Sequence, residues 1–312
     1  MSEQRRNLSQ YIRDWIGESK GRFDTRQLDH DCGITTTEHR DVRRHVIMYL
    51  IKDGKIEAIP SLHGVYRSMG SELTPIDWQA ADEKNVVSLK FPFQLERYVR
   101  IFPGQLIVVA GEKSSGKTGF LYDLVLKNMH HEKGVTLFNS ETGPAQMKKR
   151  FLSYEVDIPS PPPWKTYMVY SDFADMLDPD GITVIDYLDI KSEFYRQGEE
   201  MDKIFKKLNT GVAVIGEQKP PPTIVYYKGK KRRVHRDLAY GGGTTIQAAT
   251  LYLSLDKINA TLGRLKIVDC KEPVDGGVNP SGMQWSFNID SRGRFYNIAP
   301  YMGLNQEEYE ED

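Results

Sequence analysis

The sequence predicts an α/β protein with a mainly parallel sheet flanked by helices, preceded by a small helical domain. From residue 104 onward, short apolar runs alternate with segments of helical period, as in proteins whose parallel strands are joined by helices. A glycine-containing octapeptide, GEKSSGKT (111–118), lies between the first apolar run and the first of these helical segments. Before it, residues 7–67 show three helical segments and then a short alternating pattern.

Composition limits the classes that the protein can belong to. With 312 residues, the chain has room for about two domains. The net charge of -1, from 42 basic and 43 acidic residues, excludes a uniformly basic nucleic-acid coat but not a local basic site. Hydrophobic residues make up 39% of the chain, which excludes wholesale disorder.

The cysteines and the lengths of the apolar runs indicate where in the cell we expect the protein. Cys32 and Cys270 match no metal-ligand spacing, and we expect two buried, reduced thiols. The N-terminus carries no apolar signal-peptide segment, and no apolar run approaches the ~18 residues of a membrane span. We therefore expect a cytoplasmic protein with no membrane partner.

The first 67 residues resemble a winged helix-turn-helix domain. Helical spacing in 7–20 is followed by a short helix capped by Asp24 or Thr25 and a longer helix capped within 35–37, and then by a hairpin. In this interpretation the longer helix faces a DNA groove. Its candidate nucleic-acid contacts are Arg40, Arg43 and Arg44. The alternative is a winged helix used for protein contacts or oligomerisation, because basic residues barely outnumber acidic ones here.

The octapeptide fits the phosphate-binding pattern G-x-x-x-x-G-K-[ST]. An apolar strand is expected at 104–110 and a helix at 118–129, which is the context that the motif requires. Backbone N–H groups and the helix N-terminus would bind phosphate, Lys117 would reach the β- and γ-phosphates, and Thr118 would bind Mg²⁺. No guanine signature is present, so ATP is favoured. The candidate nucleotide-binding residues are Gly111, Glu112, Lys113, Ser114, Ser115, Gly116, Lys117, Thr118 and Gly119.

Three further apolar strands end in polar residues. The strand at 134–143 ends beside Glu141, which would activate the attacking water; the alternative is a surface-loop glutamate. The strand at 181–190 ends in Asp186, a candidate Mg²⁺-side carboxylate, with Asp189 as the alternative. The strand at 211–219 ends in Gln218, a candidate γ-phosphate sensor.

A basic segment, 219–236, follows this last strand directly. It holds seven Lys or Arg residues and no acidic residue, and its prolines predict a loop or β-excursion rather than a helix. Basic groups neutralise phosphates and tyrosine rings stack on unpaired bases, so we expect contact with single-stranded DNA. A solvated basic loop or targeting-like patch is the alternative. The candidate residues are Tyr226, Tyr227, Lys228, Lys230, Lys231, Arg232 and Arg233.

Residues 91–298 resemble the RecA-like P-loop ATPases, and among them the motor domain of DnaB-type replicative helicases. The resemblance is carried by LIVVAGEKSSGKT (106–118), TLFNSETGPAQMKKRFLS (136–153), TVIDYLDI (183–190) and VAVIGEQ (212–218). It implies catalytic roles for Lys117, Glu141 and Gln218, and a role for Lys271 on the ATP of a neighbouring subunit. The family's partner arginine is replaced by Pro273, and Arg264 or Arg292 could substitute for it.

The sequence thus predicts a winged helix (1–67), a linker (68–90), a RecA-like ATPase domain (91–304) and an acidic tail (305–312). We expect a Mg²⁺-dependent, DNA-associated ATPase of replication, recombination or a phage or mobile-element process, with self-assembly and a protein partner as further expectations. The alternative is a DNA-binding regulator, adaptor or loader that uses ATP as a slow switch.

Overall fold

The computed structural model describes residues 3–19, 22–60, 62–68, 77–187, 194–227 and 230–301. The chain divides into two compact units, residues 1–81 and 82–312. Val87 and Leu89, which fall in the stretch predicted as a linker, are buried in the hydrophobic core of the C-terminal unit. In an extended segment, residues at alternating positions point to the same side. Val87 and Leu89 can therefore both pack on the core although the stretch around them is polar.

The N-terminal unit combines three helices with a three-stranded antiparallel sheet of order β1-β3-β2. Asp24 caps the second helix by accepting from the backbone N–H groups of Arg26 and Gln27, and Thr36 caps the third by accepting from that of His39. Asp24 is one of the two caps that the sequence offered for the second helix, and Thr36 lies within the predicted 35–37. The helices and strands are α1 (Glu3–Glu18), β1 (Arg22–Asp24), α2 (Thr25–Asp31), α3 (Thr37–Lys52), β2 (Ile56–Ala58) and β3 (Val65–Ser68).

The C-terminal unit is built on a nine-stranded sheet of order β14-β13-β12-β11-β4-β8-β7-β5-β6. Its strands are β4 (Leu106–Gly111), β5 (Val135–Asn139), β6 (Lys165–Met168), β7 (Ile182–Asp186), β8 (Val212–Gln218), β11 (Leu251–Lys257), β12 (Leu262–Cys270), β13 (Gln284–Ile289) and β14 (Phe295–Pro300). The strands from β6 to β11 are parallel, and β12 to β14 continue antiparallel. This confirms the predicted α/β fold class, a mainly parallel sheet flanked by helices.

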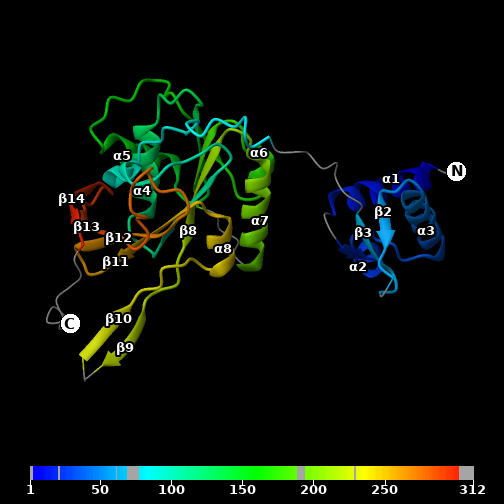
Figure 1. Cartoon of the computed structure of the whole chain (residues 1–312). Helices are drawn as coiled ribbons and strands as arrows, with labels where there is room; N and C mark the ends of the chain where they lie inside the picture. Colours follow the sequence, from blue (N-terminus) through cyan, green and yellow to red (C-terminus); the bar gives the residue numbers. More distant parts are fainter. Residues whose placement is uncertain are drawn as a thin grey trace. The chain divides into compact units, whose positions relative to one another are not determined.

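Helices cover both faces of this sheet (Figure 1). Successive residues of β4 alternate between two hydrophobic clusters, with Ile107 and Val109 in one and Leu106 and Val108 in the other. The first cluster includes α4 residues and the second α7 residues, so the sheet is the middle of three layers. The helices are η1 (Pro92–Arg97), α4 (Lys117–Lys127), α5 (Pro144–Leu152), α6 (Phe173–Met176), α7 (Phe194–Lys207) and α8 (Gly243–Ala248).

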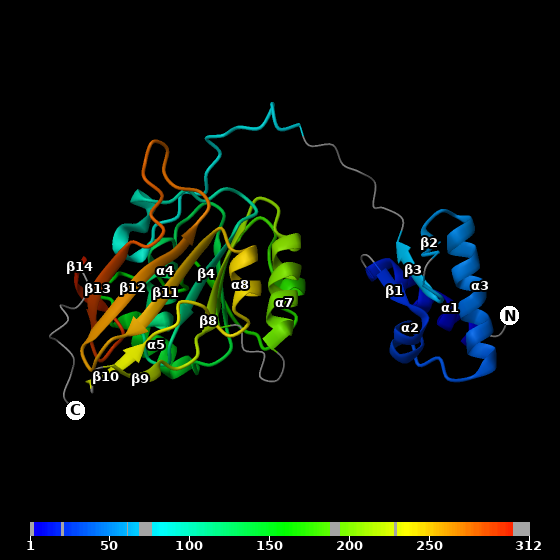
Figure 2. The same cartoon turned by 60° about the horizontal axis from the view of Figure 1, so that its bottom comes forward.

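The basic segment forms a β-hairpin of its own, made of β9 (Thr223–Tyr227) and β10 (Lys230–Val234). Figure 1 shows this hairpin extending away from the sheet, and Figure 2 shows the same hairpin after the view is turned. The prediction of a β-excursion rather than a helix is confirmed. Its prolines, at 220–222, precede β9, where the missing N–H groups remove no bond from the ladder.

The sequence also led us to expect buried, reduced cysteines and no membrane-spanning segment. Cys32 and Cys270 are both buried and free, as predicted. None of the helices among the described residues has the length and apolarity that crossing a bilayer requires.

Candidate functional site

The carboxyl ends of β4, β5, β7 and β8 meet at one edge of the sheet, and the octapeptide follows β4 at that edge. The chain turns into α4 through Gly116, whose φ of 98° lies in the left-handed region. A Cβ at this position would lie 2.5 Å from the Cδ1 atom of Ile289. The left-handed backbone conformation therefore favours glycine here, and an added Cβ would in addition force the end of the Ile289 side chain to shift.

Lys117 is almost fully buried at the first turn of α4, with 7% of its surface exposed. Its ammonium donates to the side-chain oxygen of Gln218, at 3.4 Å, and lies 3.9 Å from the centre of the Tyr187 ring. The cation–π contact stabilises the ammonium in a position that water reaches poorly. The structure thus brings together Lys117 and Gln218, two predicted residues, and adds Tyr187, which the sequence analysis did not single out.

Thr118 and Asp186 also meet at this edge. The Thr118 hydroxyl donates to one carboxylate oxygen of Asp186 at 3.2 Å. Burial raises the pKa of Asp186 to about 6, against the opposing effects of the Lys117 charge and the Thr118 hydrogen bond, while the charge of Glu141 adds to the increase. Among the described residues, none hydrogen-bonds the other Asp186 oxygen. A hydroxyl and a carboxylate are hard oxygen donors, so the pair fits Mg²⁺.

Glu141 is exposed just beyond the end of β5. It acts electrostatically on Asp186, as does Arg150 of α5, whose charge lowers the pKa of that carboxyl. The segment before Glu141 is fixed to the end of β7, because the Ser140 N–H donates to the backbone oxygen of Asp186 and its hydroxyl to that of Tyr187. Arg150 was not singled out in the sequence, since nothing in its spacing marks it as part of a site.

Lys271 lies at the opposite edge of the sheet. Leu251 is paired both with Cys270 and with Ile107, near the start of β4, whereas the phosphate-binding loop follows the end of β4. The Lys271 ammonium donates to the backbone oxygen of Gln247 at 2.8 Å. The structure therefore does not bring Lys271 to the other predicted catalytic residues of its own chain, and Pro273 is in a backbone bridge with Val99.

The two suggested substitute arginines differ in position. Arg264 of β12 pairs with the buried carboxylate of Asp256, through contacts of 2.6 and 3.0 Å. Arg292 lies in the β13–β14 turn, and the backbone oxygen of Gly293 in that turn would be 2.4 Å from a Cβ at Gly119. This turn packs against the first turn of α4. Arg292 therefore lies in a turn close to the phosphate-binding loop of its own chain.

The hairpin presents the predicted nucleic-acid residues in antiparallel register. Tyr226 is opposite Lys231, Tyr227 opposite Lys230, and Val225 opposite Arg232. The Tyr226 side chain is 76% exposed, and Arg233 is exposed as well. Lys228, and Asp189 on the strand-end side, lie outside the described residues.

The arginines of α3 fall into two groups. Arg40 and Arg44 are exposed, as contacts to a ligand would require. Arg43 instead forms an ion pair with Asp29 of α2, and only 14% of its side chain is exposed. Arg43 therefore joins α2 to α3 within the unit.

Comparisons with known proteins find structural likeness alone. No protein-family model matches this sequence, and no curated protein matches it. A RadB recombinase structure is 15% identical, with a TM-score of 0.41, over 62% of this chain and 91% of that one. A KaiC-like protein from Pyrococcus horikoshii is 16% identical, with a TM-score of 0.47, over 69% and 98%.

A third solved structure, that of an ATPase domain, is 14% identical, with a TM-score of 0.47, over 70% of this chain and 94% of that one. Likeness at these identities and scores carries no conclusion about the ligands or partners of this chain.

Proposed function

We propose that this protein is a Mg²⁺-dependent ATPase that acts on DNA, in replication, recombination or a phage or mobile-element process. One observation carries the proposal: the contacts of Lys117 with Gln218 and of Thr118 with Asp186 assemble four predicted residues around one loop. The four come from α4, β7 and β8. The loop turns through a glycine and has a lysine, a hydroxyl and a carboxylate beside it. These groups suit a nucleoside triphosphate with its metal ion.

Each residue has a distinct part in the proposed reaction. Backbone N–H groups of the loop and the Lys117 ammonium bind the phosphates. Thr118 and Asp186 hold Mg²⁺, which neutralises phosphate charge when bound. Glu141, beside Asp186 and open to solvent, orients the attacking water and takes its proton. Gln218 contacts Lys117, and so senses whether the γ-phosphate is present.

DNA binding is assigned to the β9–β10 hairpin. Its basic residues neutralise backbone phosphates, and the exposed Tyr226 ring offers a stacking surface to an unpaired base. Gln218 ends β8, and the segment that follows it runs into the hairpin, whose first strand begins at Thr223. The nucleotide and the single strand would therefore be bound by neighbouring parts of one chain.

A second candidate function is a regulator, adaptor or loader in which ATP is a slow switch. Two observations favour it. Lys271 lies away from its own phosphate-binding loop, so fast turnover would depend on assembly. On α3, Met48 and Tyr49 are 67% and 52% exposed, which suits a protein partner better than a DNA groove. The N-terminal unit, which we assign to the winged-helix class, would supply that contact.

The test is ATP hydrolysis by the full chain, with and without single-stranded DNA. Lys117→Ala is expected to abolish turnover, because the ammonium that binds the phosphates is removed. Lys127→Ala, at the other end of α4, removes an exposed ammonium that lies 3.6 Å from the half-buried Asp123; it is the matched control and is expected to keep turnover. Strong stimulation by single strands supports the motor, and slow, unstimulated turnover supports the switch. Unchanged turnover in Lys117→Ala would contradict the ATPase assignment.

A further inference from the structure

The β9–β10 hairpin is rooted in the neighbourhood of the phosphate-binding loop at both of its ends. Within the described residues, β9 and β10 pair with each other and with no strand of the main sheet. An isolated two-stranded hairpin has little stability of its own in water, so its position depends on what holds its ends. Lys219 precedes the hairpin and His235 follows it directly.

The entry end is fixed by a buried lysine. The backbone N–H of Lys219 donates to the carbonyl of Gly111, the first residue of the loop, at 2.9 Å. Its ammonium, which is fully buried, donates to the Ser254 hydroxyl at 2.6 Å and to the carboxylate of Asp256. Because a buried charge is costly without its partner, this end cannot leave β11 easily.

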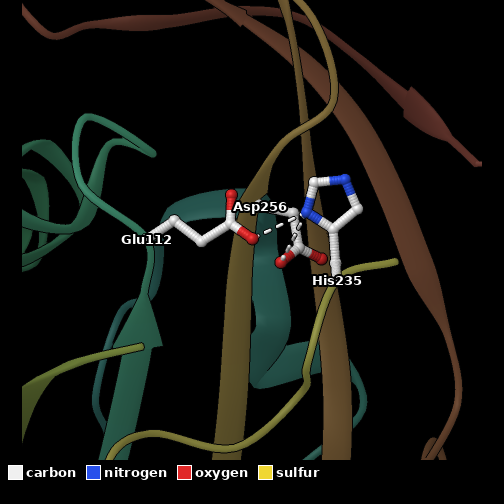
Figure 3. Close-up of side chains that lie close together, drawn as sticks. All are labelled: Glu112, His235 and Asp256. Atoms are coloured by element: carbon white, nitrogen blue, oxygen red, sulfur yellow. Dashed lines mark hydrogen bonds and ion pairs between the residues drawn. The ribbon is translucent and has the colours of Figure 1, made fainter. Parts of the chain in front are cut away.

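The exit end is fixed to the loop itself. Nδ1 of His235 lies 2.7 Å from a carboxylate oxygen of Glu112, the second residue of the loop, and 3.8 Å from one of Asp256. In Figure 3 the three side chains point toward one another. Glu112 and His235 have side chains only 6% and 8% exposed. The Glu112 carbonyl also accepts the N–H of Ser115, so this residue belongs to the loop's own hydrogen bonding.

The residue types of this cluster resemble a cation site, but its charges do not suit one. Asp256 already accepts from the ammonium of Lys219 and from the guanidinium of Arg264. A divalent ion placed between the carboxylates would meet two positive groups that already neutralise Asp256. The cluster is better explained as a junction between three parts of the chain: the phosphate-binding loop, β11 and the end of the hairpin.

We propose that the Glu112–His235 contact couples nucleotide in the phosphate-binding loop to the position of the hairpin, with His235 as a positioning residue. When the loop closes on phosphate, Glu112 moves with it. Without His235, the Glu112 oxygen that it contacts would lose this partner, and the buried carboxylate would keep only the longer 3.3 Å bond from the Lys257 N–H. His235, and the strand that ends before it, therefore follows Glu112. The coupling rests on the proposed nucleotide binding, and it gives that site a mechanical output at the DNA-binding hairpin.

The test is hydrogen exchange at the backbone amides of β9 and β10, measured with and without Mg²⁺-ADP or a non-hydrolysable ATP analogue. Nucleotide is expected to change exchange in the wild-type hairpin by about five-fold or more, the lower end of common coupling strengths. His235→Phe keeps a ring but removes the donor, and is expected to bind nucleotide while its hairpin no longer responds. His235→Asn keeps a donor near the Nδ1 position and is expected to restore the response.

Lys266→Met is the matched control. It breaks the 2.6 Å pair with Asp237, two residues beyond His235, and so loosens the same end without touching Glu112. Its hairpin is expected to respond to nucleotide as the wild type does. An equal response in His235→Phe and wild type, or no response in a wild-type protein with nucleotide bound, would overturn the coupling. Failure of the wild type to bind either nucleotide would instead overturn the proposed function.

Discussion

Asp186 is a carboxylate that folding places in surroundings unfavourable to its charge. It is 1% exposed at the end of β7, and burial raises its pKa to about 6, against an ordinary value of 3.8. A raised pKa means that the folded protein binds this proton more tightly than the unfolded chain does. In the nucleotide-free protein, the stabilising effect of the proton is therefore lost as pH rises from about 4 through 6.

We therefore expect Asp186→Asn to increase the free energy of unfolding by an amount that depends on pH. The amide oxygen still accepts from Thr118 but carries no charge. At pH 7.5 the variant is expected to have a free energy of unfolding higher than the wild type by on the order of 3 kcal/mol, the equivalent of the pKa difference. At pH 5 the gain should shrink by about half. The measurement is calorimetric unfolding of the nucleotide-free protein across this range, and a gain independent of pH would contradict the prediction.

At the scale of elements, the β13–β14 turn packs on the start of α4. The Tyr154 hydroxyl donates to the backbone oxygen of Gly119 at 2.8 Å and lies 3.5 Å from that of Gly293. A Cβ at Gly119 would lie 2.4 Å from the Gly293 oxygen, which is backbone and cannot rotate away. The first turn of α4 thus needs glycine for close approach, although its helical conformation would accept alanine.

Gly119→Ala is therefore expected to destabilise the C-terminal unit by about 1–3 kcal/mol, the usual cost of overpacking. Gly143→Ala is the control, since no atom lies within 4 Å of the Cβ it would add and its φ of -68° is ordinary. Thermal unfolding of both variants measures the difference. Equal stability of the two would show that the turn does not hold the helix.

At the scale of the whole molecule, the position of Lys271 connects activity to assembly. The residue lies at the edge of the sheet opposite to the loop of its own chain. If Lys271 is catalytic, this position leaves it only the nucleotide of another copy, which is the role that the sequence resemblance implies. RecA-like self-assembly and the role of Lys271 are thus one hypothesis with one test.

Mixing Lys117→Ala with Lys271→Ala provides this test. Each variant alone is expected to hydrolyse ATP poorly, for lack of a working loop or of the neighbour's lysine. In mixed assemblies some interfaces join an intact loop to an intact Lys271, so turnover should exceed the sum of the separate rates. No gain on mixing, under conditions where the wild type assembles, would contradict a role across the interface.

The sequence by itself determined the local parts of this protein. The octapeptide and its flanking strand and helix, the strand-end residues Asp186 and Gln218, and the helix caps at Asp24 and Thr36 were all predictable. Each rests on residues close in the chain, where spacing alone fixes which groups share a face or an end.

Only the tertiary structure decided which distant residues meet. Glu112 contacts His235, which is far from it in the sequence, and Arg43 forms an ion pair with Asp29. The Lys117 ammonium lies over the ring of Tyr187. No periodicity encodes such contacts, because they depend on strand order and on how loops return to the sheet. The same reason places Lys271 away from the phosphate-binding loop of its own chain: β12 runs antiparallel to β11, so the end of β12 lies at the far edge of the sheet.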